Sequence, residues 1–313
     1  MISEATERTF VLFVLGAVLV IQGCATLMVP PPPAPDGYAL KPAATGALAE
    51  AAQGFSAVHP PPSSGFLPLS ANKDAFEWRL LLVDRAVRSI DVQYFIWQND
   101  AAGILLFDRL LQAADRGVRV RVLVDDFALA SKDRNIAAIT RHPNVDIRIY
   151  NLGRVRDSTL GGIGEFMLYF KELNRRMHNK SFTADNQATI VGGRNVGDEY
   201  FGATAGVLFA DLDVLAIGPV VPEVSSDFDR YWASASAYPV EQLLPDASDA
   251  DLRELERRAL KLENDQAATD YVKAVSESDF VRQLLSGALE FDWARTRMVS
   301  DSPAKGLGKS ERE

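Results

Sequence analysis

Apolar positions in the middle of the chain alternate between the spacing of a helix and the spacing of a strand. Residues 76–87 carry apolar side chains at helical intervals, and residues 90–97 are mostly β-branched or aromatic, as in a buried strand. A second helical pattern precedes residues 118–124, where apolar and polar positions alternate as in a strand. This order of strand, helix and strand, continued by a third strand at 145–150, predicts a parallel sheet with right-handed crossovers.

The helix expected between the first two strands has both of its ends marked. Asp100 can accept a hydrogen bond from the first turn, and Gly117 is suited to the position after the last turn. Ser131 is placed to open the next helix. Farther along, the pattern predicts a glycine-bearing loop at 153–164, helices at 166–175, 220–232, 246–262 and 280–291, and strands at 178–183, 188–193, 212–217 and 293–299.

The N-terminus has the pattern of a targeting segment. Residues 10–21 form an apolar run without charges, which is short for a membrane span but right for the core of a signal peptide. The run leads to Gly23 and Cys24, and this ending resembles the lipobox of bacterial lipoproteins, in which the cysteine is lipidated. An acidic start with Glu4 and Glu7 departs from that pattern. The alternative is a buried segment or an uncleaved anchor with an incidental cysteine.

Residues 25–69 are rich in proline and alanine and have little periodicity, especially from Pro30 to Ser64. Proline-rich segments favour the extended polyproline II conformation, so we expect a tether between the anchor and a folded body that begins near Ser70.

One stretch combines residues that suit chemistry on phosphate. His178, Lys180 and Asp185 form H-x-K-x4-D, and Gly192-Gly193-Arg194-Asn195 follows. On a strand, His178 and Lys180 would project to the same face. A neutral imidazole is a nucleophile, a lysine ammonium can hold phosphate oxygens, and the Asn195 amide can donate to another. The alternative is a solvated histidine and lysine at a sheet edge.

This stretch resembles the H-K-D motif of the phospholipase D superfamily. The runs 94–97, 116–120, 192–195 and 198–201 are similar to its cardiolipin-synthase-related branch, and the similarity covers roughly residues 70 to 240. The resemblance implies an α/β fold, in which one phospholipase D-like lobe has a mixed sheet flanked by helices. It also implies phosphatidyl transfer or hydrolysis on phospholipid substrates, with no cofactor and no required metal.

The resemblance assigns roles within the motif. His178 would be the nucleophile or the general acid, and Lys180 and Asn195 would bind phosphate. Asp185 belongs to the catalytic motif, although its place at the far end of the strand favours a structural role. Asp198, or else Glu199, would orient the imidazole. Gly193 replaces a serine that is often found there, with the loss of one hydroxyl donor.

The motif occurs once, whereas the family builds one site from two copies. Its chemistry passes through a phosphohistidine and needs a second acid to protonate the leaving oxygen. The partner would be a second phospholipase D-like lobe, either a missing C-terminal half or another copy in a homodimer. The alternatives are a catalytically incomplete fragment that binds a membrane or a partner, and a homodimeric nuclease. The predicted parts are a signal segment (1–24), a tether (25–69), the motif-bearing lobe (70–245), and a helical linker with the start of an incomplete second lobe (246–313).

Composition excludes some classes of protein. The 313 residues have a net charge of −9, which argues against a nonspecific nucleic-acid partner, because such proteins present a basic field. Only His178 of the three histidines, His59, His142 and His178, lies in an H-x-K pattern, so a metal site built on histidines is not expected. The single cysteine excludes an intramolecular disulfide. With the lipobox, these observations predict a lipoprotein anchored to a membrane of the bacterial envelope.

Overall fold

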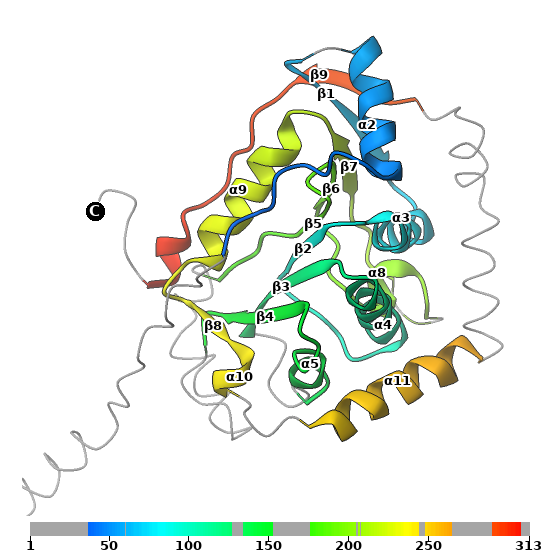
Figure 1. The fold of residues 1–313 in the computed structure, drawn as a ribbon, viewed down its shortest axis with the longest axis vertical. Helices are drawn as coiled ribbons and strands as arrows, with labels where there is room; N and C mark the ends of the chain where they lie inside the picture. The colour runs from blue at the N-terminus through cyan, green and yellow to red at the C-terminus, as the bar shows by residue number, and fades with distance from the viewer. Residues whose placement is uncertain are drawn as a thin grey trace, which may run out of the picture. The chain divides into compact units, whose positions relative to one another are not determined.

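A mixed sheet forms the centre of the fold (Figure 1). The computed structural model describes residues 37–59, 61–126, 134–152, 176–204, 206, 208–243, 248–264 and 290–307. All of them belong to the unit formed by residues 31–313. The predicted signal segment with Cys24, the loop at 153–164, the helices at 166–175 and 280–291 and the helix start at Ser131 lie outside the described residues.

Nine described strands are hydrogen-bonded in the order β8-β4-β3-β2-β5-β6-β7-β1-β9. The three strands β2, β3 and β4 are parallel, and every other pairing is antiparallel. The strands are β1 (Ser63–Leu69), β2 (Ser89–Tyr94), β3 (Arg119–Asp125), β4 (Val145–Tyr150), β5 (Ser181–Ala184), β6 (Ala188–Gly192), β7 (Asp213–Ile217), β8 (Ala237–Pro239) and β9 (Asp292–Arg295).

Helices cover both faces of the sheet (Figure 1). The first face holds α3 (Asn72–Arg85), α4 (Ala101–Asp115), α5 (Arg134–Ile139) and α8 (Asp198–Phe201), and the opposite face holds α9 (Val220–Trp232). The remaining helices are α2 (Ala47–Val58), α10 (Val240–Leu243), α11 (Asp249–Glu263) and the 3-10 helix η2 (Pro303–Leu307). None of the helices in the described ranges is long and apolar enough to cross a membrane.

Alternation along β3 divides the core between the two faces. Val122 and Val124 join the core under α3 and α4, whereas Leu123 packs with Phe228 and Trp232 from α9. The polar positions of β3 are also used internally. Arg121 is 1% exposed, and its guanidinium donates to Asp91 at 2.7 Å and to Asp229 at 2.9 Å.

Most of the predicted elements are confirmed. Asp100 caps α4 by accepting from Gly103 N at 3.0 Å, and Gly117 takes the left-handed φ of 91° that favours glycine after a helix. The parallel series β2–α4–β3–α5–β4 is present. The strands at 188–193 and 212–217 and the helices at 220–232 and 246–262 appear as β6, β7, α9 and α11.

Two secondary-structure predictions are wrong in part. Residues 30–64 were expected to be extended, but α2 and the start of β1 lie there. Residues 47–58 are rich in alanine, the best helix former, and Leu48 and Phe55 pack against the core. The motif strand begins at Ser181, so residues 178–180 are an approach to β5 rather than part of it. The division of the chain into four parts stays a prediction.

The end of the described chain returns to the same sheet. β9 pairs with β1, so the predicted strand at 293–299 becomes an edge strand over a shorter range. The segment from β9 to η2 then runs along α9 (Figure 1). Hydrogen bonds fix it there: Met298 N donates to Glu223, and the Tyr231 hydroxyl donates to Asp301 O at 3.1 Å.

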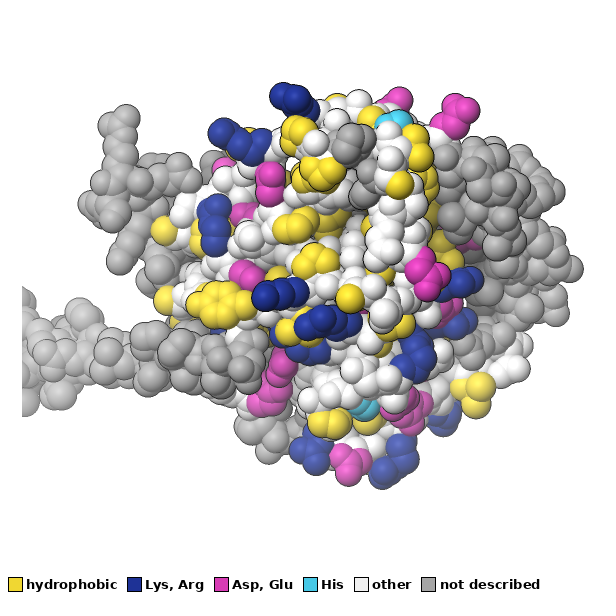
Figure 2. Space-filling model, turned by 45° about the horizontal axis from the view of Figure 1, so that its top comes forward, with side chains coloured by type: hydrophobic (Ala, Val, Ile, Leu, Met, Phe, Trp, Pro, Cys, Tyr) yellow, Lys and Arg dark blue, Asp and Glu magenta, His cyan; other side chains and the backbone are white. Residues whose placement is uncertain are grey.

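The described surface mixes charges of both signs. On the face drawn in Figure 2, lysine and arginine side chains are interspersed with acidic and apolar ones. That face therefore lacks the continuous basic field that nonspecific nucleic-acid binding needs.

Candidate active site

His178 and Lys180 come together where the chain enters β5. Lys180 Nζ donates to His178 O at 2.8 Å and lies 3.4 Å from His178 Nδ1. The predicted pairing of the two side chains is therefore present, but the expected reason, alternation along a strand, does not apply. A loop turns the lysine amine back onto the histidine.

The aromatic ring of Phe95, just after β2, forms one wall of this pair. Its centroid lies 5.0 Å from the His178 ring and 5.6 Å from Lys180 Nζ. Lys180 is 6% exposed, whereas His178 is exposed to solvent. The histidine is thus accessible to a substrate, and the buried lysine contacts it from the protein interior.

The surroundings favour a neutral imidazole. Burial lowers the pKa of His178, the ammonium groups of Lys180 and Lys305 lower it further, and Asp211 opposes them. Burial also lowers the pKa of Lys180 to about 8, against the opposing charges of Asp211 and Asp213. At pH 7 the histidine can therefore act as a nucleophile while the lysine remains mostly protonated.

Asp211 is a candidate site residue that the sequence analysis missed. It lies just before β7, and its carboxylate sits over the backbone of Gly193, where an added Cβ would lie 2.0 Å from Asp211 Oδ1. It is the acid whose charge acts on His178 and most strongly on Lys180. The signal was the Asp211-Leu212-Asp213 run, which becomes informative only once β7 is paired with β6.

The two acids predicted to orient His178 lie on α8 instead. The Asp198 carboxylate accepts from Ala102 N at 2.8 Å, and Asp198 N donates to Asp100 at 2.7 Å. Burial raises the pKa of Asp198. Glu199 has one buried carboxylate oxygen without a hydrogen-bond partner among the described residues. The structure thus uses Asp198 to join α8 to α4, and neither acid is hydrogen-bonded to His178 among the described residues.

Asn195 connects two parts of the site. Its side-chain oxygen accepts from Ile96 N at 3.0 Å, and its amide donates to the Tyr200 hydroxyl at 3.0 Å. The side chain is thereby held in place, and a second N–H of the amide remains for a ligand. Its predicted phosphate contact stays a prediction.

Asp185 lies at the opposite end of β5 from Lys180, in the turn to β6. The four residues of β5 separate the two, and the five steps of extended chain span roughly 16 Å. Asp185 is 1% exposed, and its carboxylate accepts from the backbone N–H groups of Val87, Arg88 and Ser89. These contacts fix the start of β2 and agree with the structural role argued from its position.

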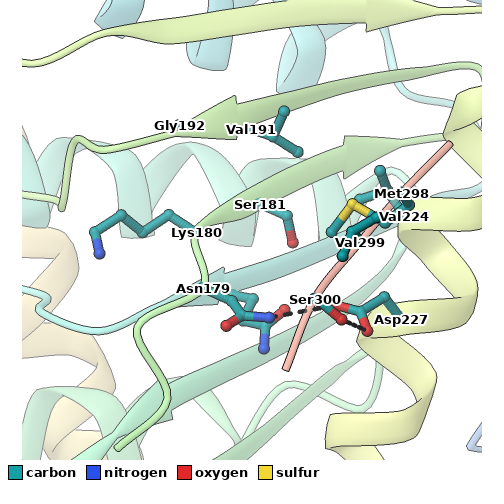
Figure 3. Close-up of a pocket in the computed structure, with 11 residues that line it drawn as sticks. Asn179, Lys180, Ser181, Val191, Gly192, Val224, Asp227, Met298, Val299 and Ser300 are labelled. Atoms are coloured by element: carbon teal, nitrogen blue, oxygen red, sulfur yellow. Dashed lines mark hydrogen bonds between the residues drawn. The ribbon is translucent and has the colours of Figure 1, made fainter. Parts of the chain in front are cut away.

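A cavity of about 230 Å³ adjoins the site on the α9 face (Figure 3). Its lining includes Asn179, Lys180 and Ser181, and the Lys180 side chain extends away from the other lining side chains in Figure 3. Ser300 closes it by donating to Asp227, which also accepts from Asn179 at 3.3 Å. Within the described ranges, no cluster of three or more histidine, cysteine or acidic residues is arranged to hold a metal.

The sequence of the chain matches a protein-family model and several curated proteins. The profile of the family described as "Cardiolipin synthase, PLD-like domain" matches residues 81–232. The chain is 46% identical to cardiolipin synthase C of Escherichia coli strain K12 over 254 residues, which cover 80% of this chain and 52% of that protein. It is 29% identical to cardiolipin synthase A of Pseudomonas putida strain W619 over 211 residues, which cover 64% and 41%.

Among solved structures, the chain is similar to phosphatidylserine synthase of Haemophilus influenzae Rd KW20. The TM-score is 0.43 with 11% identity, and the match covers 68% of this chain and 48% of that one. The chain spans about half the length of the curated relatives it matches.

Proposed function

Because this chain belongs to the cardiolipin-synthase-related branch of the phospholipase D superfamily, we propose that it forms half of a site that transfers or hydrolyses the phosphodiester of phospholipids. The contact between Lys180 and an exposed His178 beside Asp211 carries the proposal. An accessible neutral imidazole can attack phosphorus, and a cation next to it can hold the phosphate oxygens.

The proposed reaction proceeds in two steps, formation and breakdown of a phosphohistidine. An imidazole nitrogen of His178 attacks the phosphorus, and the bond to the leaving alkoxide breaks as the N–P bond forms. A second acid protonates that alkoxide, and the same group then takes a proton from water or an alcohol that attacks the phosphohistidine. Lys180 and Asn195 stabilise the charge on the phosphate oxygens. Asp211, whose charge acts on His178, is a further candidate to orient the imidazole beside Asp198 and Glu199.

A second histidine must complete the site. We propose that it comes from a second phospholipase D-like lobe, either in the same longer polypeptide or in a second copy of this chain. The exposed face at His178 is where such a lobe would meet the phosphate. In a homodimer, two His178 residues would face each other across a two-fold axis.

The membrane is the proposed location. A lipid on Cys24 would hold the chain at a bacterial membrane, where phospholipid substrate is concentrated.

The test is incubation of the purified protein with phosphatidylglycerol vesicles over a range of protein concentrations. We expect phosphatidic acid or cardiolipin by mass spectrometry, and an acid-labile phosphoenzyme at His178. His178→Ala should lower turnover by several powers of ten, because the nucleophile acts as a unit with its partners. His142→Ala is the matched control, since His142 pairs with Asp115 at 3.3 Å in a turn beyond α5.

The concentration dependence distinguishes the alternatives. A second-order dependence on protein indicates a homodimer, and addition of His178→Ala protein should then inhibit the wild type through mixed dimers. Absence of both product and phosphoenzyme at every concentration would refute activity of this chain by itself. It would favour the second candidate, a fragment that only binds a membrane or a partner, which the single motif motivates.

A further inference from the structure

A buried carboxylate lies behind the site, between two buried arginines. Asp213 is fully buried, and its Oδ2 accepts from Arg79 Nη2 at 2.7 Å. Its Oδ1 accepts from Arg194 N at 3.2 Å, and the Arg194 guanidinium lies 3.7 Å from Oδ2. Arg79 also donates to the Tyr94 hydroxyl at 2.7 Å. The network therefore ties the end of β2 to the Gly-Gly-Arg-Asn segment.

Arg194, despite its place in that segment, does not face a substrate. Its guanidinium donates to Leu69 O at 2.9 Å and to Ser70 O at 2.7 Å. It also donates to Asn72 Oδ1 at 2.9 Å. Arg194 has no exposed surface, and these bonds hold the Gly192–Asn195 segment against the start of α3.

The strand register aligns this network with Lys180. Ser181 is opposite Gln93 on one side and Val191 on the other, and Gly192 is opposite Asp213. Lys180 precedes Ser181 and therefore lies opposite Gly192, so that Lys180, Gly192 and Asp213 form one row across the three neighbouring segments. Neighbouring strands lie about 4.8 Å apart, so the Cα atoms of Lys180 and Asp213 are separated by about 10 Å. The glycine leaves that gap without a side chain.

The two glycines make room for two carboxylates. A Cβ at Gly192 would lie 2.2 Å from Asp213 Oδ1, and a Cβ at Gly193 would lie 2.0 Å from Asp211 Oδ1. At Gly192 the added atom would also lie 2.5 Å from Leu212 O, so a side chain there would need the backbone of β7 to move. At Gly193 it would meet only the exposed side chain of Asp211, which can move away.

We propose that Asp213 is a positioning residue of the site, which fixes the Gly192–Gly193 segment through Arg194 and places a carboxylate in the same cross-strand row as Lys180, with Gly192 between them. This proposal deepens the proposed function and rests on it for its catalytic consequence. The charged groups that act on Lys180 are Asp211 and Asp213, and those that act on His178 are Lys180, Lys305 and Asp211. Asp213 thus acts on the lysine, whereas Asp211 acts on both groups.

That asymmetry defines the experiment. Lysines of the full chain are labelled by reductive ¹³C-methylation, the Lys180 signal is assigned by its loss in Lys180→Arg, and Lys180 and His178 are titrated by NMR. Asp213→Asn should lower the pKa of Lys180 from about 8 by on the order of half a unit, and leave His178 unchanged. Asp211→Asn should move both groups. An unchanged Lys180 in folded Asp213→Asn protein would overturn the proposal.

Asp213→Asn leaves two buried guanidinium groups without their carboxylate and can fail to fold. The double variant Arg79→Met/Asp213→Asn removes one charge of each sign, so the buried net charge is unchanged, and the same titration then decides. If both variants unfold while Asp211→Asn folds, Asp213 has a structural role only, and the proposal is overturned.

The titration needs no turnover, so it remains readable if the proposed function is refuted. Where the wild type is active, the alkaline limit of its activity should move to lower pH in Asp213→Asn. An alkaline limit that stays at the wild-type pH in active Asp213→Asn protein would contradict the effect of Asp213 on Lys180.

Discussion

Substitution of Asp185 tests whether this residue of the H-x-K-x4-D motif stabilises the fold without taking part in the proposed chemistry. Replacing it by alanine removes the acceptor of three backbone N–H groups at the start of β2, from Val87, Arg88 and Ser89. Asp185 also has a left-handed φ of 53°, which aspartate and asparagine tolerate better than alanine. The proposed site at His178 lies at the other end of β5 and should not be affected.

The magnitude follows from the exposure of the three donors. Ser89 is buried, so its N–H would lose a charge-assisted bond with no water to replace it, at about 1–3 kcal/mol. Val87 and Arg88 are exposed, and their N–H groups would contribute about 0.5–1.5 kcal/mol each. With about 1 kcal/mol for the left-handed backbone, the free energy of unfolding should fall by about 3–7 kcal/mol.

Urea unfolding followed by circular dichroism measures this loss, and a Tm lower by roughly 10 °C would accompany it. Asp185→Asn keeps one acceptor oxygen and the backbone preference, so it should lose only about 1–2 kcal/mol. Asp211→Asn, an exposed carboxylate, is the control and should stay within about 0.5 kcal/mol of the wild type. A stable Asp185→Ala protein with an altered His178 titration would refute the structural assignment.

Two further predictions concern charge and location. Because the pKa of Lys180 is about 8, activity that needs its ammonium should fall above that pH. In Lys180→Arg, whose side chain stays charged, this alkaline limit of activity should move to higher pH. An alkaline limit that does not move would exclude Lys180 as the titrating group. Cys24→Ser should release the protein from the membrane fraction, since each buried lipid methylene contributes about 0.8 kcal/mol, whereas an unchanged mass and fractionation would show that Cys24 carries no lipid.

Local patterns along the chain determined most of the elements. The cap at Asp100 depends on a side chain and a backbone three residues away, and the alternation of β3 is a property of neighbouring residues. The H-x-K spacing likewise needs no distant partner, because Lys180 reaches back to His178 within the same loop. Interactions of short range in sequence could therefore be predicted.

Composition alone misled the prediction for residues 30–64. Alanine-rich sequence is compatible with a tether and with a helix, and packing of Leu48 and Phe55 on the core decided for α2. The start of β5 was also decided by pairing, because Ser181 is the first residue of the approach to be hydrogen-bonded in register with Gln93.

Tertiary structure determined which acidic residues lie near His178 and Lys180. Asp211 and Asp213 lie more than 30 residues from His178 and Lys180 in sequence, and the antiparallel pairing of β5, β6 and β7 brings them together. Asp198 and Glu199 were nearer in sequence, but the short helix α8 directs Asp198 to the start of α4. The sequence by itself predicted the groups that are proposed to attack and hold a phosphate. Only the strand register decided which carboxylates lie beside them, because Gly192 stands opposite Asp213 only once β6 and β7 are hydrogen-bonded to each other.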